Sequence, residues 1–188
     1  MYLRQNTMNK TIAFAGSNAK KSINQQLTTY VANLSNEIDF LDLRDYADVP
    51  MYNFDDEQLN GIPAKIQALY TLLQPYKNVI MASPEHNGMP PSFLKNILDW
   101  LSRAEGEKFL QGKKVVLLST SPGGYGGANN LNNLKNIMPY WGAEVVATFS
   151  LPKFYENIEE GQIIIKNATK KQELMTAISA LELSTTEV

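Results

Sequence analysis

Five short, strongly apolar runs alternate with longer segments of helical period, and this alternation restricts the possible folds more than any other feature of the chain. The runs are TIAFA (11–15), IDFLDL (38–43), NVIMAS (78–83), KVVLLST (114–120) and EVVATFSL (144–151). Apolar residues recur at helical spacing over residues 23–34, 63–73, 91–101, 127–138 and 169–183. Parallel strands need crossover connections, usually helices, so the sequence predicts an α/β fold with a parallel sheet covered on both faces.

The same pattern indicates where a ligand would bind. In open α/β sheets, ligands collect beyond the carboxyl ends of the strands, near the point where the strand order reverses. We therefore expect the loops after the first, third and fourth strands to form a site. Residues 44–62 are the longest irregular segment, and this length indicates a functional loop more than a linker.

Composition removes several classes of function. The 188 residues are 44% apolar, which predicts one domain over residues 11–188 after a polar extension at 1–10. The net charge of −2, without any Lys/Arg-rich block, makes nucleic acid an unfavourable partner. The chain has no cysteine, which excludes disulfides, thiolate nucleophiles and iron–sulfur ligation, so any redox chemistry needs a bound cofactor. No apolar run approaches the ~20 residues of a membrane span, and we expect a cytoplasmic protein.

The first loop, GSNAKKSIN (16–24), combines a glycine turn with short hydroxyl and amide side chains where a helix begins. A helix N-terminus offers free N–H groups and the positive end of its dipole, so this loop suits a phosphate. The sequence is neither a Walker loop nor a G-x-G-x-x-G dinucleotide motif. Two interpretations stay open, a phosphate site and a plain helix cap by Ser22 between solvated lysines.

The loop after the fourth strand, STSPGGYGGANNL (119–131), has four glycines within five positions. Glycine lets a backbone approach a flat ligand closely, whereas the alternative is a flexible strand-to-helix turn.

The loop after the third strand, SPEHNGMPP (83–91), contains the chain's single histidine. One histidine beside Glu85 is a poor metal-ligand set, and the G-x-S-x-G elbow of a serine hydrolase is missing. His86 therefore has two interpretations, contact with a ligand or a subunit interface, and an ordinary loop position. Pro91 or Ser92 is expected to open the next helix.

Together, GSNAKKSIN, SPEHNGMPPSFLKNILDW and SPGGYGGANNL resemble the NADPH-dependent FMN reductase family over about residues 10–155. The family pattern is G-S-x-R-x-x-S-x-N, then P-E-Y-N with P-x-x-L-K-N-x-x-D-W, then S-x-G-x-x-G-G. The resemblance implies a flavodoxin-like three-layer sandwich whose five-stranded sheet has the order 2-1-3-4-5. It also implies FMN as cofactor and NAD(P)H as electron donor.

Carried over position by position, the resemblance places the FMN phosphate at Ser17, Ser22 and Asn24, and the ring between the second and third loops. The full set of implied FMN-binding residues is Ser17, Lys20, Ser22, Ile23, Asn24, Pro84, Glu85, His86, Asn87, Ser121, Gly123 and Gly124. No catalytic side chain and no metal are expected, because the flavin would carry the chemistry.

Three residues depart from the family pattern. Ala19 replaces an arginine, so Lys20 or Lys21 would have to supply the phosphate-binding charge. His86 stands at a tyrosine position, and Asn129 stands where arginine often follows the glycines.

The resemblance implies a reductase that passes electrons from NAD(P)H to a small acceptor by a ping-pong mechanism. Quinones, azo compounds, free flavins and metal oxyanions are the acceptor classes. The alternatives are a flavodoxin-like electron carrier and a non-catalytic flavin-binding regulator. A homodimer or homotetramer is implied, with Tyr52, Phe54 and the 44–62 segment as candidate interface residues.

Overall fold

Five parallel strands form a sheet in the order β2-β1-β3-β4-β5 in the computed structural model, which describes residues 10–183. The strands are β1 (Thr11–Ala15), β2 (Ile38–Leu41), β3 (Asn78–Ala82), β4 (Lys114–Thr120) and β5 (Glu144–Leu151). This confirms the predicted sheet and its strand order. β1, β3 and β4 are almost completely buried, as their continuous apolar runs require in a parallel sheet covered on both faces.

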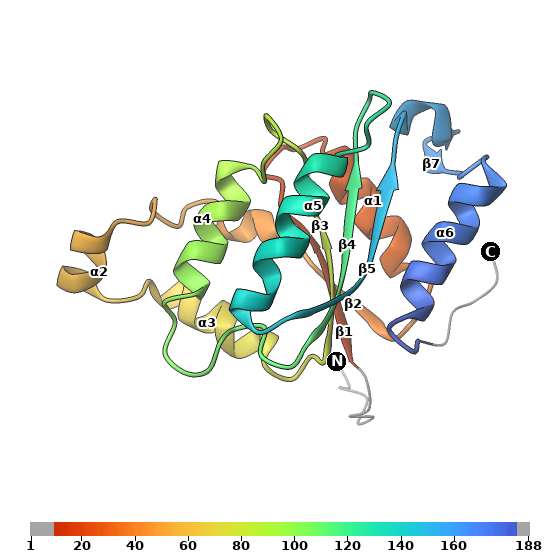
Figure 1. The fold of residues 1–188 in the computed structure, drawn as a ribbon. Helices are drawn as coiled ribbons and strands as arrows, with labels where there is room; N and C mark the ends of the chain where they lie inside the picture. The colour runs from red at the N-terminus through yellow and green to blue at the C-terminus, as the bar shows by residue number, and fades with distance from the viewer. Residues whose placement is uncertain (1–9, 184–188) are drawn as a thin grey trace.

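Helices cover the two faces of the sheet in separate layers (Figure 1). One layer contains α3 (Ala64–Leu73), α4 (Ser92–Leu101) and α5 (Ala128–Ile137), and the other contains α1 (Ile23–Ala32) and α6 (Ala168–Ser179). Successive strand residues point to opposite faces, so Val115 and Leu117 pack in the first layer while Val116 and Leu118 pack in the second. The chain therefore folds as a three-layer α/β sandwich.

Several predicted boundaries were wrong. The segment 44–62, expected to be irregular, contains a 3₁₀ helix (Leu43–Tyr46) and α2 (Phe54–Asn60). The last helix ends at Ser179, although Leu181 and Leu183 beyond it are still buried. A short antiparallel hairpin of β6 (Ile158–Glu159) and β7 (Gln162–Ile163) was not predicted, nor were two further 3₁₀ turns, Met138–Trp141 and Phe154–Asn157.

The predicted N-terminal extension lies outside the described residues except for Lys10, and the assignment of 11–188 to a single domain stays a prediction. Within residues 10–183, each helix is too short or too polar to cross a bilayer.

Tyr76 links α3 to the edge strand β2 and gives the fold a specific dependence on alkaline pH. Burial, together with a 2.8 Å hydrogen bond that Tyr76 Oη donates to Asp39 Oδ2, raises the pKa of Tyr76 to about 12. A raised pKa means that the folded chain holds this proton more tightly than the unfolded chain, whose tyrosines titrate near 10. This contribution to stability is therefore complete below about pH 10 and is lost as the pH rises from about 10 to 12.

We expect Tyr76→Phe to remove this contribution to the loss of folding stability at alkaline pH. The free energy of unfolding, measured by urea titration at several pH values, should fall less steeply above about pH 10 in the variant than in the wild type. In an Asp39→Asn background the effect of Tyr76→Phe should shrink, because the carboxylate acceptor is gone. Parallel pH profiles for the wild type and Tyr76→Phe would contradict this assignment.

Candidate functional site

Three loops meet at the carboxyl edge of the sheet, as predicted from their positions after the first, third and fourth strands. Gly16 N–H donates to Ala82 O over 2.8 Å, which joins the end of β1 to β3. Ser83 N–H donates to Leu118 O over 2.9 Å, which joins the end of β3 to β4. The parallel register thus places residues 16–22, 83–91 and 121–127 side by side at this edge (Figure 1).

The first loop forms an N-terminal helix cap that still has a hydrogen-bond donor to offer. Ser22 is the N-cap of α1, and its Oγ accepts a 3.2 Å hydrogen bond from Gln25 N–H, a cap that is compatible with both interpretations of the loop. In the described part of the chain this hydroxyl donates to no other group. The first turn of α1 contains no acidic residue, so an anion placed there meets the dipole without a competing carboxylate of the same helix. Ser17 and Ser22 are both buried, whereas Lys20 is exposed.

Asn24 connects the first loop to the end of β4. Its side chain is buried, its Nδ2 donates to Thr120 O, and its Oδ1 accepts from Thr120 N–H, both over 3.0 Å. The backbone N–H and C=O of one residue, Thr120, therefore engage both ends of the amide. The structure assigns Asn24 a positioning role, and direct contact with a phosphate stays a prediction, as it does for the neighbouring half-buried Ile23.

The four glycines of the third loop fall into two pairs, of which one is required by the packing of the protein and the other is not. Gly126 and Gly127 have φ of 60° and 79°, and an added Cβ would lie 2.1 Å from Ser150 Oγ and 1.9 Å from Ser119 Oγ, respectively. These two positions are dictated by the protein's own packing. A Cβ on Gly123 or Gly124 would meet nothing within 4 Å, and neither residue has a positive φ. Their bare backbone is therefore an open surface with no internal need for glycine, which fits a flat ring lying over it.

Ser121 holds the third loop in shape. Its Oγ accepts from Gly126 N–H over 3.0 Å and donates to Gly123 O over 3.1 Å. Gly123 O also accepts from Lys153 N–H over 2.9 Å, which ties the loop to the segment after β5. These hydrogen bonds therefore fix the backbone of the loop that carries Gly123 and Gly124.

The second loop ends in a two-residue hairpin turn. His86 and Met89 exchange backbone hydrogen bonds of 2.9 and 3.1 Å, and Asn87 and Gly88 have φ of 54° and 81°. Positive φ at both central residues is the signature of a type I′ turn, for which Asn-Gly is the preferred sequence. His86 and Asn87 are exposed on this turn. No group of three or more potential metal ligands occurs among residues 10–183.

Glu85 locks the second loop onto the third. Its Oε2 accepts a 3.0 Å hydrogen bond from Asn130 N–H, and its Oε1 accepts a 3.4 Å bond from Asn129 Nδ2. The N-cap of α5 is Gly127, which has no side chain, so Glu85 caps this helix from a different loop. The N-terminus of α5 is therefore already neutralised, in contrast to that of α1.

Asn130 belongs to the same cluster, and sequence reasoning missed it. It is fully buried, and its Nδ2 donates to Ser83 Oγ over 2.8 Å and to Pro84 O over 2.9 Å. These bonds fix the half-buried Pro84 at the edge of the site. A polar residue early in a helix carries no sequence signal that would have revealed these partners.

We expect Glu85→Ala to lower the free energy of unfolding by about 1–2 kcal/mol, because a cap with charge-assisted hydrogen bonds is lost. Urea unfolding measures this change. Glu156→Ala is the matched control, since the Glu156 side chain makes an exposed ion pair with Lys153 and no other ion pair within residues 10–183, and its loss should cost less than about 0.5 kcal/mol. Equal losses in the two variants would contradict the capping role.

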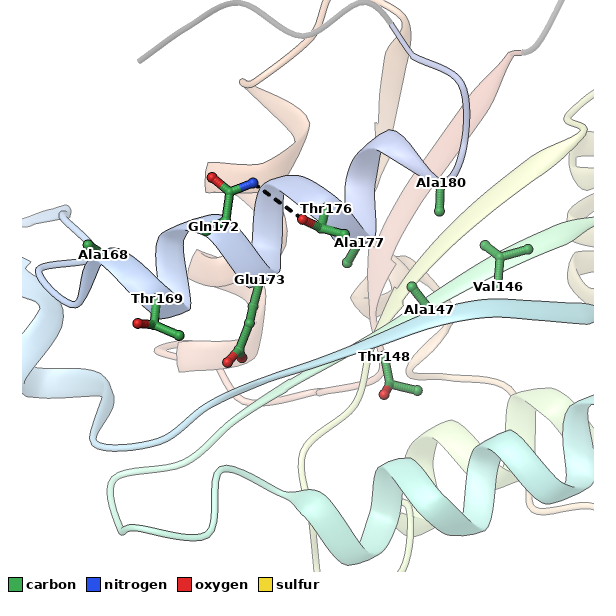
Figure 2. A pocket seen from close by; sticks show the side chains of 10 residues that line it. All are labelled: Val146, Ala147, Thr148, Ala168, Thr169, Gln172, Glu173, Thr176, Ala177 and Ala180. Atoms are coloured by element: carbon green, nitrogen blue, oxygen red, sulfur yellow. Dashed lines mark hydrogen bonds between the residues drawn. The ribbon is translucent and has the colours of Figure 1, made fainter.

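A well-formed hollow in the described part of the chain lies away from the three loops. It is an open groove of about 760 Å³ between β5 and α6, and Figure 2 shows Val146 and Ala147 of the strand on the side of the helix, while the Thr148 side chain points away from it. None of the predicted FMN-binding residues lines it. A second hollow, of about 580 Å³, lies at the β6–β7 hairpin and also contains none of them. Neither of these two hollows is formed by the three loops.

The sheet order, the helix N-terminus without acidic residues after the first strand and the unobstructed glycines after the fourth strand together suit a flat, phosphorylated cofactor. The model of the family described as NADPH-dependent FMN reductase matches residues 9–156. The chain belongs to this family, whose members are oxidoreductases that use FMN and NAD(P)H. The resemblance stated from the three loop motifs is thereby confirmed.

Individual relatives are similar at moderate identity. The quinone reductase of Escherichia coli K12 is 33% identical over 117 residues, which are 62% of this chain and 60% of that protein. The chain thus matches about three fifths of the length of that curated relative. The 2-hydroxy-1,4-benzoquinone reductase of a Burkholderia species is 27% identical over 167 residues, 86% of this chain and 88% of that protein. Among solved structures, FerB of Paracoccus denitrificans, described as a flavoenzyme NAD(P)H:(acceptor) oxidoreductase, has a TM-score of 0.74. It is 27% identical, and the match covers 93% of this chain and 96% of FerB.

Proposed function

We propose that this protein is an FMN-dependent NAD(P)H oxidoreductase that reduces small acceptors of the quinone type. The proposal is carried by the first and third loops together. In the first loop, a buried cap hydroxyl still has a proton to donate, at a helix N-terminus whose first turn contains no acidic residue. In the neighbouring third loop, two glycines have no close contacts that would require glycine at their positions. The names of the similar proteins, two quinone-type reductases and an NAD(P)H:acceptor oxidoreductase, support the reaction class.

Each loop has a distinct part in holding the cofactor. Ser17 and Ser22 would bind the FMN phosphate through their hydroxyls, with the free N–H groups at the start of α1 and the exposed Lys20 adding positive potential. Pro84, Glu85, His86 and Asn87 would border the ring on one side. Ser121, Gly123 and Gly124 would border it on the other. Asn24 and Asn130 set the spacing between these walls through their buried hydrogen bonds.

Bound FMN supplies the redox chemistry, by accepting a hydride from NAD(P)H and passing electrons to the acceptor. The chain's own residues bind and orient the reactants, which explains why no acid–base pair is needed among them. Because the three loops offer one surface for the flavin, donor and acceptor would use the same face in turn. Steady-state rates of the FMN-loaded protein with NADPH and a benzoquinone should give parallel double-reciprocal lines. Intersecting lines would contradict alternate use of one site.

We also propose that residues 50–62, here called the arm, contact a second copy of the chain in a homodimer or homotetramer. The arm contains α2, and Figure 1 shows α2 standing away from the rest of the molecule. Met51, Phe54 and Leu59 are 69%, 59% and 81% exposed, and apolar side chains gathered on a protruding element indicate a contact surface.

The base of the arm is firmly anchored. Trp100 Nε1 donates to Pro50 O over 2.8 Å, and the Tyr52 ring packs edge-on against Trp100 at 5.0 Å. Glu57 accepts from Tyr52 Oη over 2.8 Å and pairs with Arg103 over 2.9 Å.

Light scattering of a Phe54→Ser/Leu59→Ser variant tests the interface. A lower mass than that of the wild type supports the interface, and an unchanged mass rejects it.

A cytoplasmic location stays a prediction.

A further inference from the structure

Two charged side chains at the end of β2 contact the first loop from its outer side. Asp42 Oδ1 accepts from Arg44 Nε over 2.8 Å and from Arg44 N–H over 3.0 Å. The two groups of the guanidinium that face Asp42 form a fork with its carboxylate, which fixes the orientation of the arginine. The remaining terminal nitrogen, Nη1, donates to Lys20 O in the first loop over 3.4 Å.

Gln25 lies at the other end of the loop. Its N–H donates to Ser22 Oγ over 3.2 Å, and its side chain contributes, after the larger effect of Arg44, to lowering the pKa of Asp42. The hydrogen bonds therefore join Lys20 to Arg44 and Asp42 on one side of the loop and Ser22 to Gln25 on the other. We call Gln25, Asp42 and Arg44 the brace.

The charges of the brace suit an anion site. Asp42 lies close enough to Gln25, in the first turn of α1, for that side chain to influence its pKa, and an unpaired carboxylate there would repel a phosphate. The fork with Arg44 neutralises it. Lys20 and Lys21 form no ion pair with any residue in 10–183, so their charges stay available to a ligand.

We propose that the brace holds the first loop in its phosphate-binding shape and thereby determines the preference of the site for FMN over riboflavin. This inference rests on the proposed function, since it assumes that the first loop receives the FMN phosphate. Arg44, Asp42 and Gln25 are positioning residues in this scheme, acting through Lys20 and Ser22.

Arg44→Gln and Asp42→Asn test the brace by flavin-fluorescence titration with FMN and with riboflavin. FMN should bind about tenfold more weakly in each variant, the equivalent of one charge-assisted hydrogen bond, while riboflavin should stay within about twofold because it has no phosphate. Lys65→Gln is the matched control: it breaks a 2.6 Å ion pair with Asp48 from the same part of the chain and should leave both affinities unchanged.

A second measurement needs no flavin. Amide hydrogen exchange at residues 20–25 should be faster in Arg44→Gln than in the wild type if the brace orders the loop. Equal weakening of FMN and riboflavin, or unchanged FMN affinity with unchanged exchange, would overturn the brace. A wild-type protein that binds no FMN would defeat the proposed function as well, whereas a wild type that binds FMN beside an unaffected Arg44→Gln defeats the brace alone.

Discussion

Gly127→Ala should destabilise the fold by about 2–5 kcal/mol, a large share of the stability of a typical domain. The new Cβ would lie 1.9 Å from Ser119 Oγ and 2.8 Å from Ser119 Cβ, both buried at the end of β4. In addition, φ at this position is 79°, which disfavours any residue with a Cβ. Ser119 cannot move freely, because its hydroxyl donates to Ser83 O over 2.7 Å. Urea or thermal unfolding measures the loss.

Gly124→Ala is the matched control for that experiment. It adds the same methyl group in the same loop, but into open space and at an ordinary φ. The free energy of unfolding should therefore change by less than about 0.5 kcal/mol. FMN affinity should fall instead, because the methyl group would stand in the surface that we assign to the ring. If Gly124→Ala left FMN binding unchanged, the flavin ring would not lie against the glycine surface.

Ser22→Ala should weaken FMN binding by about 1.5–3 kcal/mol, or roughly 10- to 150-fold, because a hydrogen bond to a charged phosphate is lost. The substitution also removes the cap of α1, which should cost about 1 kcal/mol of folding stability. Titration with FMN and urea unfolding measure the two effects separately.

Asn167→Ala separates the two roles of such a cap. Asn167 caps α6 by accepting from Lys170 N–H over 3.0 Å, and it belongs to none of the three loops. It should lose a similar amount of folding stability while keeping wild-type FMN affinity. If both variants bound FMN equally well, Ser22 would be a cap and nothing more.

The sheet and the place of the site could be predicted because both follow from local patterns. Continuous apolar runs such as KVVLLST specify strands buried on two faces, and parallel strands bring their following loops to one edge. The Asn87-Gly88 turn also follows from sequence, since this pair prefers the positive φ values of a type I′ turn.

The helix α2 escaped prediction because it has no apolar stripe and buries no residue. A usable signal was present: Asn53 caps the helix, and Asp55, Asp56 and Glu57 form an acidic first turn. A cap residue followed by an acidic first turn therefore marks this helix in the sequence.

The contacts that connect the loops could not be predicted. Glu85 caps α5 from 45 positions away, and Asn24 meets Thr120 across 96 positions. Partners this distant in sequence become neighbours only through the strand order. The Asp42–Arg44 pair is local, but its contact with Lys20 again depends on how β2 lies beside β1.

Anaerobic mixing of the FMN-loaded protein with NADPH tests the central claim most directly. A reductase should bleach the visible absorption of its flavin at once, and a quinone added afterwards should restore it. An electron carrier would keep its colour until a partner reductase was supplied. A protein that stayed colourless after incubation with FMN, or that kept its flavin oxidised in excess NADPH, would contradict the account.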